Sequence, residues 1–273
     1  MFKKRIKYSK EEFEKTQLPN NRKEVFYDVL KQRYDVFIKL GLLGFILLLP
    51  IVLISFYFDL INLETANKNF DIYILYKNLA LVILSPLIAL YLTAFLEVVK
   101  KLVWYEPILI SDAVINGVKN NYKQILIISL YTSLIYAASN AIVNINTYDW
   151  ILNIIKYIPF SLSIVVVLPT YGFVVMQITV YKEGLLKHIV NGFILYIVTF
   201  IKSLLIIILN ILPFVLTILI PNLIIKYIVI LTLITIYTPI TLLVWQLHTH
   251  SVFDQYINKD NYENIYKKGI NKI

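Results

Sequence analysis

The sequence predicts an all-α integral membrane protein with six transmembrane helices, two cytosolic interfacial helices and an N-terminal amphipathic helix. Hydrophobic residues make up 59% of the 273-residue chain and charged residues only 16%, whereas soluble domains are nearer to half apolar and a quarter charged. Six stretches without Asp, Glu, Lys, Arg or His are long enough to cross a bilayer. Lys and Arg concentrate in alternate segments between those stretches.

The composition also excludes several functional classes. The chain has no Cys, which excludes thiolate metal sites, thiol catalysis and redox switching. The net charge of +9 comes from basic segments beside the helices, so no nucleic-acid partner is expected. These segments are expected to attract anionic lipid instead. A long charged segment precedes the first apolar run, so we predict no signal peptide and a retained first span.

The N-terminal region 1–36 is predicted to be a cytosolic tail in two parts. The first is a cluster of basic residues, namely Lys3, Lys4, Arg5, Lys7 and Lys10. After the helix-start signal Pro19-Asn20-Asn21, apolar residues recur at helical spacing, namely Val25, Phe26, Val29, Leu30, Val36 and Phe37. We interpret this second part as an amphipathic helix that lies on the inner leaflet and leads into the first span. Docking to a cytosolic partner is the alternative.

The membrane domain, 37–258, contains the six spans, because a transmembrane helix needs about 20 apolar residues. The charge-free stretches cover residues 40–58, 78–96, 124–148, 157–181, 203–225 and 227–247. Only Lys226 separates the last two, and Pro221-Asn222 predicts a hairpin there. Prolines within the spans are expected to kink them, and these are Pro50, Pro86, Pro159, Pro169, Pro213 and Pro239.

The charges between the spans predict the orientation. Of the 26 Lys and Arg residues, 22 lie in 1–39, in 97–123, in 182–202 and in 248–273, and 4 lie in the other segments. Six spans place these two groups on opposite sides of the membrane. The positive-inside rule puts the richer side in the cytosol. We therefore predict a multi-pass protein with both termini cytosolic, in which residues 259–273 form a C-terminal tail.

Two cytosolic stretches, 107–123 and 184–199, are predicted to be the interfacial helices. Their apolar residues recur at helical spacing, namely Ile110, Val114, Val118 and Tyr122 in the first, and Leu186, Ile189, Val190, Phe193 and Ile197 in the second. His188 is assigned to the polar face of the second. The candidate partner contacts are polar residues on these helices, namely Asp112, Asn116, Lys119, Lys187 and Asn191. A single helix over 185–220 would be about 54 Å long, so we expect a bend near Lys202.

The same two stretches share a sequence pattern. Ala113–Val118 is similar to His188–Phe193, which lies 75 residues further along the chain. Each follows an even-numbered span and precedes an odd-numbered one on the same side of the membrane. A parallel duplication, spans 2–3 against spans 4–5, would explain the similarity. Two coincidental Asn-Gly matches in a chain rich in Ile, Val and Asn would explain it as well.

The sequence predicts no enzyme, no cofactor and no metal. The six windows lack the ionisable group that proton-coupled carriers keep in the membrane, and the chain shows no catalytic carboxylate pair, phosphate loop or nucleophile elbow. The pair His250–Asp254 at i,i+4 is compatible with a metal, but an interfacial helix end explains it more simply. Neutral polar residues in the spans are interpreted as interhelical hydrogen-bonding groups, with a path for an uncharged solute as the alternative. They are Ser129, Thr132, Ser133, Ser139, Asn140, Asn144, Gln177, Asn210, Thr232, Thr235 and Thr238.

Several short motifs resemble the YesL-like family, bacterial membrane proteins grouped under a domain of unknown function. The likeness covers roughly 37–258, and the motifs are Leu42–Pro50, Ser85–Tyr91, Ile110–Ala113, Lys119–Gln124, Lys182–Lys187 and Phe253–Tyr256. The chain departs from the family pattern at Ser85-Pro86-Leu87, where the family has a Gly-Pro-Ala type of start. It also has Ala113 and Gly117 where aromatic residues are expected.

The resemblance implies a place in the bacterial inner membrane and an association with ABC systems for carbohydrate uptake, and it implies no catalytic residues. We therefore expect a non-enzymatic accessory component whose partners are the lipid bilayer and ABC transporter subunits. One alternative is a permease subunit of an ABC importer, since Asp112-Ala113 and Gly117 approximate the coupling loop of such permeases. The other alternative is a membrane-anchored lipid-handling protein.

Overall fold

A computed structural model describes residues 18–64, 70–145 and 149–271 of the chain. Every regular element within these residues is helical, which confirms the predicted all-α class. Six helical stretches are long and apolar enough to cross a membrane, which confirms the six spans. The basic cluster Lys3–Lys10 lies outside the described residues.

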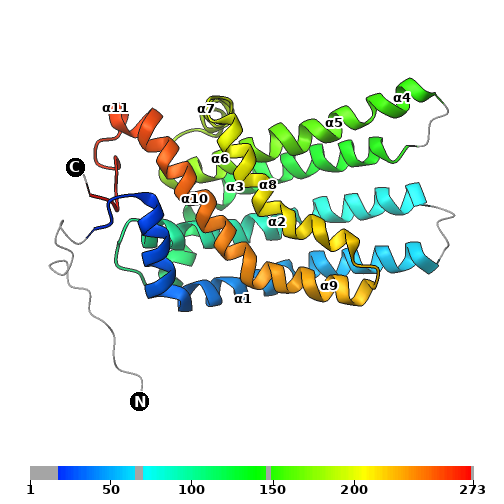
Figure 1. Ribbon diagram of the computed structural model, residues 1–273, viewed down its shortest axis with the longest axis horizontal. Coiled ribbons are helices and arrows are strands. Elements are labelled where there is room, and N and C mark those ends of the chain that lie inside the picture. Colours follow the sequence, from blue (N-terminus) through cyan, green and yellow to red (C-terminus); the bar gives the residue numbers. More distant parts are fainter. Residues whose placement is uncertain (1–17, 65–69, 146–148, 272–273) are drawn as a thin grey trace, which may run out of the picture.

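Most of the helices run side by side along the long axis of the molecule, whereas α7 and the first part of α1 lie across it (Figure 1). In chain order they are α1 (Arg22–Glu64), α2 (Phe70–Val103), α3 (Ile110–Val143), α4 (Trp150–Ile155), α5 (Tyr157–Leu162), α6 (Leu168–Val180), α7 (Leu185–Val198), α8 (Phe200–Leu216), α9 (Leu223–Thr232), α10 (Thr238–Phe253) and α11 (Lys259–Asn261). Shorter turns between them are the π-helices Ser163–Val167, Leu233–Tyr237 and Asp254–Asn258 and the 3-10 helix Thr217–Leu219. The fourth span consists of α4 to α6 and the sixth of α9 and α10.

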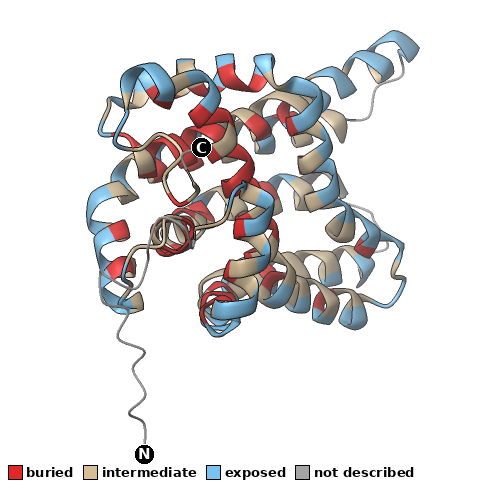
Figure 2. Cartoon of the chain, turned by 60° about the vertical axis from the view of Figure 1, so that its left-hand side comes forward, coloured by how far each residue is buried: buried red, intermediate tan, exposed pale blue. Residues whose placement is uncertain are grey.

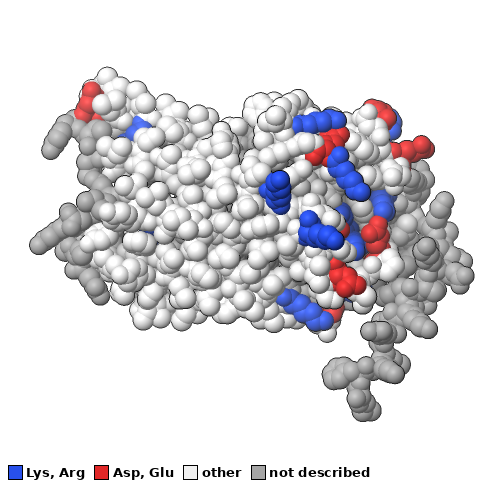
Figure 3. Space-filling view, turned by 180° about the vertical axis from the view of Figure 1, so that it is seen from behind, with Lys and Arg blue, Asp and Glu red and all other residues white. Residues whose placement is uncertain are grey.

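Most charged side chains gather at one end of the bundle, beyond a broad uncharged band (Figure 3). We call it the charged end. It contains the start of α1, the loops 104–109 and 181–184, and the C-terminal segment after α10. The opposite end contains the end of α1, the start of α2, the end of α3, the start of α4 and the turn between α8 and α9 (Figure 1). The uncharged band has the character of a surface that contacts the hydrocarbon part of a bilayer.

The expected amphipathic segments take three different forms. Residues 110–123 do not form a separate interfacial helix, because α3 runs without a break from Ile110 to Val143 and packs along α2. The N-terminal segment is the start of α1, which bends at Arg33 (φ −131°, ψ 29°). The helix α7 is separate, as predicted, because the backbone leaves helical geometry at Thr199 (φ −109°, ψ 20°). This break lies three residues before Lys202, where the bend was expected.

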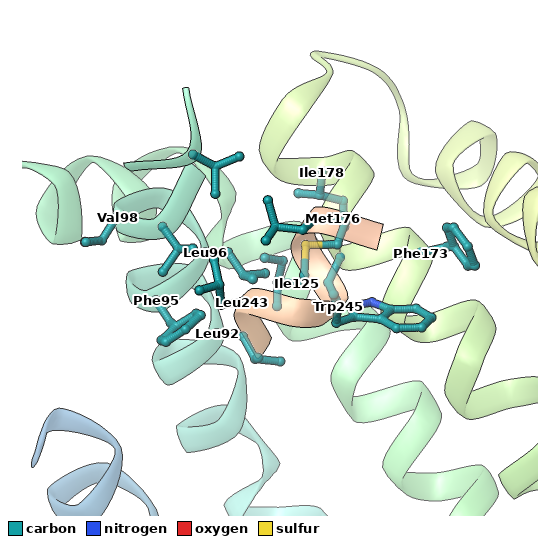
Figure 4. Close-up of a cluster of buried hydrophobic side chains, with 14 of the residues drawn as sticks. Leu92, Phe95, Leu96, Val98, Ile125, Phe173, Met176, Ile178, Leu243 and Trp245 are labelled. Carbon is teal, nitrogen blue, oxygen red and sulfur yellow. The ribbon is translucent and has the colours of Figure 1, made fainter. Parts of the chain in front are cut away.

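Each span packs beside the next along the chain, and the last one returns to the first. Contacts join α1 to α2, α2 to α3, α3 to α6, α6 to α7 and α8, α8 to α10, and α10 to α1. The helices α2, α6 and α10 also contact one another in the centre. Their side chains form the main core near the charged end (Figure 4), and among them are Leu92, Phe95, Leu96, Phe173, Met176, Leu243 and Trp245. Figure 2 shows these buried residues inside a shell of exposed ones.

Prolines within the spans free backbone carbonyls, and nearby hydroxyl groups bond to them. Proline has no N–H group, so the carbonyl four residues earlier loses its helical donor. Three such carbonyls accept a hydrogen bond from a hydroxyl group. The Val82 carbonyl, freed by Pro86, accepts from Ser85 at 2.8 Å, and the Leu209 carbonyl, freed by Pro213, accepts from Tyr237 at 2.9 Å. The Val165 carbonyl, freed by Pro169, accepts from Tyr196. Two of the three donors belong to another helix. The kinks are therefore also points where neighbouring helices are fastened together.

The opposite end of the bundle is held by one carboxylate. Asp59 on α1 forms ion pairs with Lys77 on α2 and, at 3.1 Å, with Lys226 on α9. The hydroxyl of Tyr227 donates to the same carboxylate at 2.8 Å. The hairpin between the last two spans is formed as predicted, and the side chain of Asn222 caps α9 by accepting from the backbone N–H of Ile225 at 3.1 Å.

Candidate functional site

The predicted contact residues of the first stretch share one exposed face of α3. Asp112, Asn116 and Lys119 are all exposed. Ala113 and Gly117 lie beside them on the buried side of the helix and pack against α2. Asp112 accepts a long hydrogen bond from the neighbouring Ser111 at 3.5 Å. The fold therefore positions this polar face through the small residues behind it and leaves the polar groups on the surface.

The predicted polar face of α7 is divided in the structure. Lys187 is exposed and pairs with Glu183 at 2.6 Å, whereas Asn191 is half-buried. His188 was assigned to the same polar face, but it is completely buried against α6. The side-chain amide of Gln177 donates to the His188 carbonyl at 3.4 Å. The interior side of α7 is therefore the side of His188.

Most of the apolar stripe of α7 faces away from the bundle, but Ile189 is half-buried and packs against the core. Leu186 is 79% exposed, and Val190, Phe193 and Ile197 are also exposed. In a protein with six membrane-spanning helices, an outward apolar face of this kind suits contact with lipid. The candidate contact residues therefore lie on two different helices. Asp112, Asn116 and Lys119 share one face of α3, and Lys187 and Asn191 belong to α7.

Glu183 is the charged centre of the loop before α7. Its carboxylate accepts hydrogen bonds from the Lys187 ammonium at 2.6 Å and from the Tyr262 hydroxyl at 2.7 Å. Burial raises the pKa of Glu183, but the two hydrogen bonds and the charge of Lys187 outweigh it and hold the pKa below its usual range. A lowered carboxyl pKa stabilises the folded state above the unfolded pKa, and this contribution is lost as the pH falls through the folded pKa. Burial lowers the pKa of His188, which favours the neutral ring.

A layer of buried polar side chains lies in the charged half of the bundle, and of its members the sequence predicted only Gln177 as an interhelical hydrogen-bonding group. It consists of Glu97, Lys100, Gln177, Gln246, His248 and His250. Several of its hydrogen bonds cross between helices. Gln246 donates to the Leu96 carbonyl at 3.5 Å, and Lys100 donates to the Thr179 carbonyl at 2.8 Å. The one available signal was the recurrence of Gln after the span prolines, with Gln177 eight residues after Pro169 and Gln246 seven after Pro239.

Several atoms of this layer have no hydrogen-bond partner within the part of the chain that the structure describes. These atoms are the side-chain oxygens of Gln177 and Gln246 and both ring nitrogens of His250. His248 shares a hydrogen bond of 2.9 Å with the hydroxyl of Ser203 through Nε2, while its Nδ1 also has no partner among the described residues. Unpaired buried polar groups cost free energy. The layer therefore stabilises the fold less than an apolar core would. It places polar groups where α2, α6 and α10 meet.

The pair His250–Asp254 does not form a metal site. One oxygen of Asp254 pairs with Arg22 at 2.7 Å, and the other accepts from Asn258 at 2.9 Å and from the backbone N–H of Lys267 at 3.0 Å. Both carboxylate oxygens are therefore occupied by protein donors. Across the described ranges, no three His, Cys, Asp or Glu side chains lie close enough to hold a metal ion.

Neutral polar residues within the spans bond mostly to neighbouring helices or to their own. Three of the interhelical pairs are Ser129 with Tyr171 at 2.8 Å, Asn140 with Asn78 at 3.0 Å, and Ser139 with Ser163 at 3.2 Å. The hydroxyls of Ser133, Thr232, Thr235 and Thr238 donate to carbonyls of their own spans. These contacts support the interpretation of the residues as hydrogen-bonding groups rather than as a solute path.

Comparison of the chain with family models, with curated proteins and with solved structures gives no match. The resemblance to the YesL-like family therefore rests on the short motifs alone.

Proposed function

We propose that this protein is a non-enzymatic, multi-pass protein of the bacterial inner membrane that serves as an accessory component of a carbohydrate-uptake ABC system. The observation that carries the proposal is the exposed face of Asp112, Asn116 and Lys119. It contains both signs of charge on a helix that is held rigidly by its packing on α2. Such a face favours recognition of a complementary protein surface. The partner class comes from the family resemblance.

The structure favours the accessory role over that of a permease subunit. The permease reading used Asp112-Ala113 and Gly117 as the start of a coupling loop. Gly117 has a packing role instead, because a Cβ atom there would lie 2.4 Å from the Thr93 carbonyl oxygen. The segment is also the first part of α3, which continues directly into the third span. Helix packing therefore explains the small residues at these positions.

The orientation in this proposal can be measured by labelling. The charged end is placed in the cytosol by the positive-inside rule. Because the chain has no Cys, single cysteines can be introduced without background. A cysteine at the exposed Asp149 is expected to react with an impermeant maleimide in intact cells. A cysteine at the exposed Asn120 is expected to react only after permeabilisation. Labelling of position 120 in intact cells would refute the orientation.

Replacing Asp112, Asn116 and Lys119 together with Ala is expected to reduce the co-purification of ABC transporter subunits. Exposed substitutions usually change stability by less than about 0.5 kcal/mol, so membrane insertion and the thermal midpoint are expected to stay unchanged. The measurement is affinity purification in mild detergent, followed by quantification of the bound subunits.

A matched control is available on α1. Lys31, Asp35 and Lys39 are exposed and have a similar spacing on a helix that begins at the charged end. Their replacement with Ala is expected to leave partner recovery unchanged. Equal losses in both triple variants would indicate a general charge effect. Full recovery with the α3 variant would eliminate the docking role.

A further inference from the structure

The similarity between 113–118 and 188–193 has a counterpart in the packing. Gly117 and Gly192 each lie where one helix presses against the preceding one. The Cβ position of Gly117 meets the Thr93 oxygen (2.4 Å) and Glu97 Cβ (2.8 Å), and that of Gly192 meets the Thr170 oxygen (3.4 Å) and Val174 Cγ2 (2.8 Å). In both cases the partners are four residues apart and begin with Thr. The start of α3 therefore sits on α2 as α7 sits on α6.

The six spans form three consecutive pairs, namely spans 1 and 2, spans 3 and 4, and spans 5 and 6. The second helices of these pairs, α2, α6 and α10, also share features. Each contains a span proline, at Pro86, Pro169 and Pro239. The π-helix Ser163–Val167 ends two residues before Pro169, and Leu233–Tyr237 ends two residues before Pro239. These helices, α2, α6 and α10, contact one another in the centre of the bundle. The chain is thus a ring of three helix pairs, with the second helix of each pair inside.

The ring has three seams, where the start of one pair packs on the end of the pair before it. Loop 104–109 joins the first seam, between α2 and α3, and loop 181–184 joins the second, between α6 and α7. The third seam, between α10 and α1, has no loop. Val25 and Val29 are buried on α1, three and seven residues after Arg22, and they are four residues apart like Ala113 and Gly117 at the first seam. The ion pair between Arg22 and Asp254 lies at this seam.

The C-terminal segment 259–271 covers the charged end and contacts all three seams. Lys268 pairs with Glu106 of the first loop at 2.6 Å, and its ammonium lies 4.3 Å from the ring centroid of Trp104. Tyr262 donates to Glu183 of the second loop at 2.7 Å. Figure 1 shows this segment at the same end of the bundle as the start of α1.

The same segment ends beside the start of α1. The backbone N–H of Asn271 donates to the Pro19 carbonyl at 2.9 Å, and its side chain donates to the Leu18 carbonyl at 2.7 Å. The Arg22 guanidinium donates to the Lys268 carbonyl at 2.8 Å. The segment thus spans from α10 to α1, as the two loops do at the other seams.

We propose that the C-terminal segment 259–271 is a latch that closes the ring of three helix pairs at its one seam without a covalent loop. Release of the latch opens the seam between α10 and α1, and the loops keep the other two seams closed. This opening would expose the neighbouring polar layer around His250, a residue that lies beside Arg22, Trp104 and Ile265. The proposal is independent of the docking face on α3.

The test uses a glycine that the latch requires. Gly269 has a φ of +82°, and a Cβ atom there would lie 2.1 Å from the Val103 carbonyl oxygen, so Gly269→Val displaces the segment. Gly184→Val is the matched control, because nothing lies within 4 Å of its Cβ position. The reporters are single cysteines at Val25, one helical turn after Arg22 at the third seam, and at Ala113 in the first seam, both completely buried. Maleimide labelling rates are measured on the full chain in mild detergent.

With Gly269→Val, labelling at position 25 is expected to rise about tenfold and labelling at position 113 to stay within about twofold, since local opening exposes only the released seam. Gly184→Val is expected to leave both rates unchanged. Lys268→Met, which removes only the bonds of one side chain, is expected to raise labelling at position 25 by about threefold. Unchanged labelling at position 25 in both latch variants, or equal increases at both reporters, would overturn the proposal.

Discussion

Replacement of Asp254 with Ala is expected to lower the free energy of unfolding by about 3–5 kcal/mol. The carboxylate pairs with Arg22 at 2.7 Å, and both side chains are only 11% exposed. It also accepts hydrogen bonds from Asn258 and from the backbone N–H of Lys267. Without it, the guanidinium stays buried with no counter-charge, which costs more than the attraction itself is worth. The contact that is lost is the one that joins the start of α1 to the end of α10.

The measurement is the thermal midpoint of the purified protein in mild detergent. About 2–4 °C per kcal/mol is expected for a chain of roughly this size, so the midpoint is expected to fall by about 6–20 °C. The control is Asp35→Ala, which breaks the exposed i,i+4 pair with Lys39, where the side chains are 50% and 60% exposed. Its expected loss is under about 0.5 kcal/mol. Equal midpoints for the two variants would contradict the assignment of Asp254 as a buried anchor.

The spans could be predicted because the bilayer imposes a simple local rule on the sequence. A charged side chain in the hydrocarbon is costly, so the charge-free windows coincide with helices. The hairpin at Pro221-Asn222 and the break at Thr199 also have local causes, namely turn chemistry and the maximum length of one crossing. Such features depend on neighbours in the chain and need no knowledge of the three-dimensional packing.

The interior face of α7 could not be predicted by hydrophobic periodicity. In water the apolar stripe of a helix faces the core, but lipid is as apolar as the core and removes that preference. The structure accordingly places Phe193 outside and His188 inside. Small residues are better indicators in this setting, since Gly192 marks the side of α7 that approaches α6 closely. The same rule identifies the buried side of α3 through Ala113 and Gly117.

The packing of the C-terminal region depends on contacts that join distant parts of the chain. Residues 259–273 were expected to be a tail, yet the segment up to residue 271 is folded onto the bundle. Arg22 meets Asp254 across 232 positions, and Lys268 meets Glu106 across 162. No local pattern indicates such pairs. Most of the buried polar layer could not be predicted for the same reason, because a charged residue next to a span has the same sequence pattern whether it faces water or another helix.

Replacement of Gly41 with Ala is expected to lower the free energy of unfolding by about 3 kcal/mol, at the upper end of overpacking effects. Its Cβ position lies only 1.9 Å from the carbonyl oxygen of Thr235, and a backbone oxygen cannot move aside as a side chain can. Pro239 frees this carbonyl from its helical hydrogen bond, and the bare backbone of α1 at Gly41 lets the two helices approach closely there.

The matched control is Gly44→Ala, three residues further along the same helix. Its Cβ position lies 2.9 Å from the ring of Tyr91, a side chain that can shift, so the expected loss is about 1 kcal/mol. Thermal midpoints in mild detergent compare the two variants. The Gly41 variant is expected to melt about 4–8 °C below the Gly44 variant. A Gly41 variant that melts at or above the Gly44 variant would show that α1 and the turn around Thr235 are not in close contact, and the ring of helices would then be open along this side.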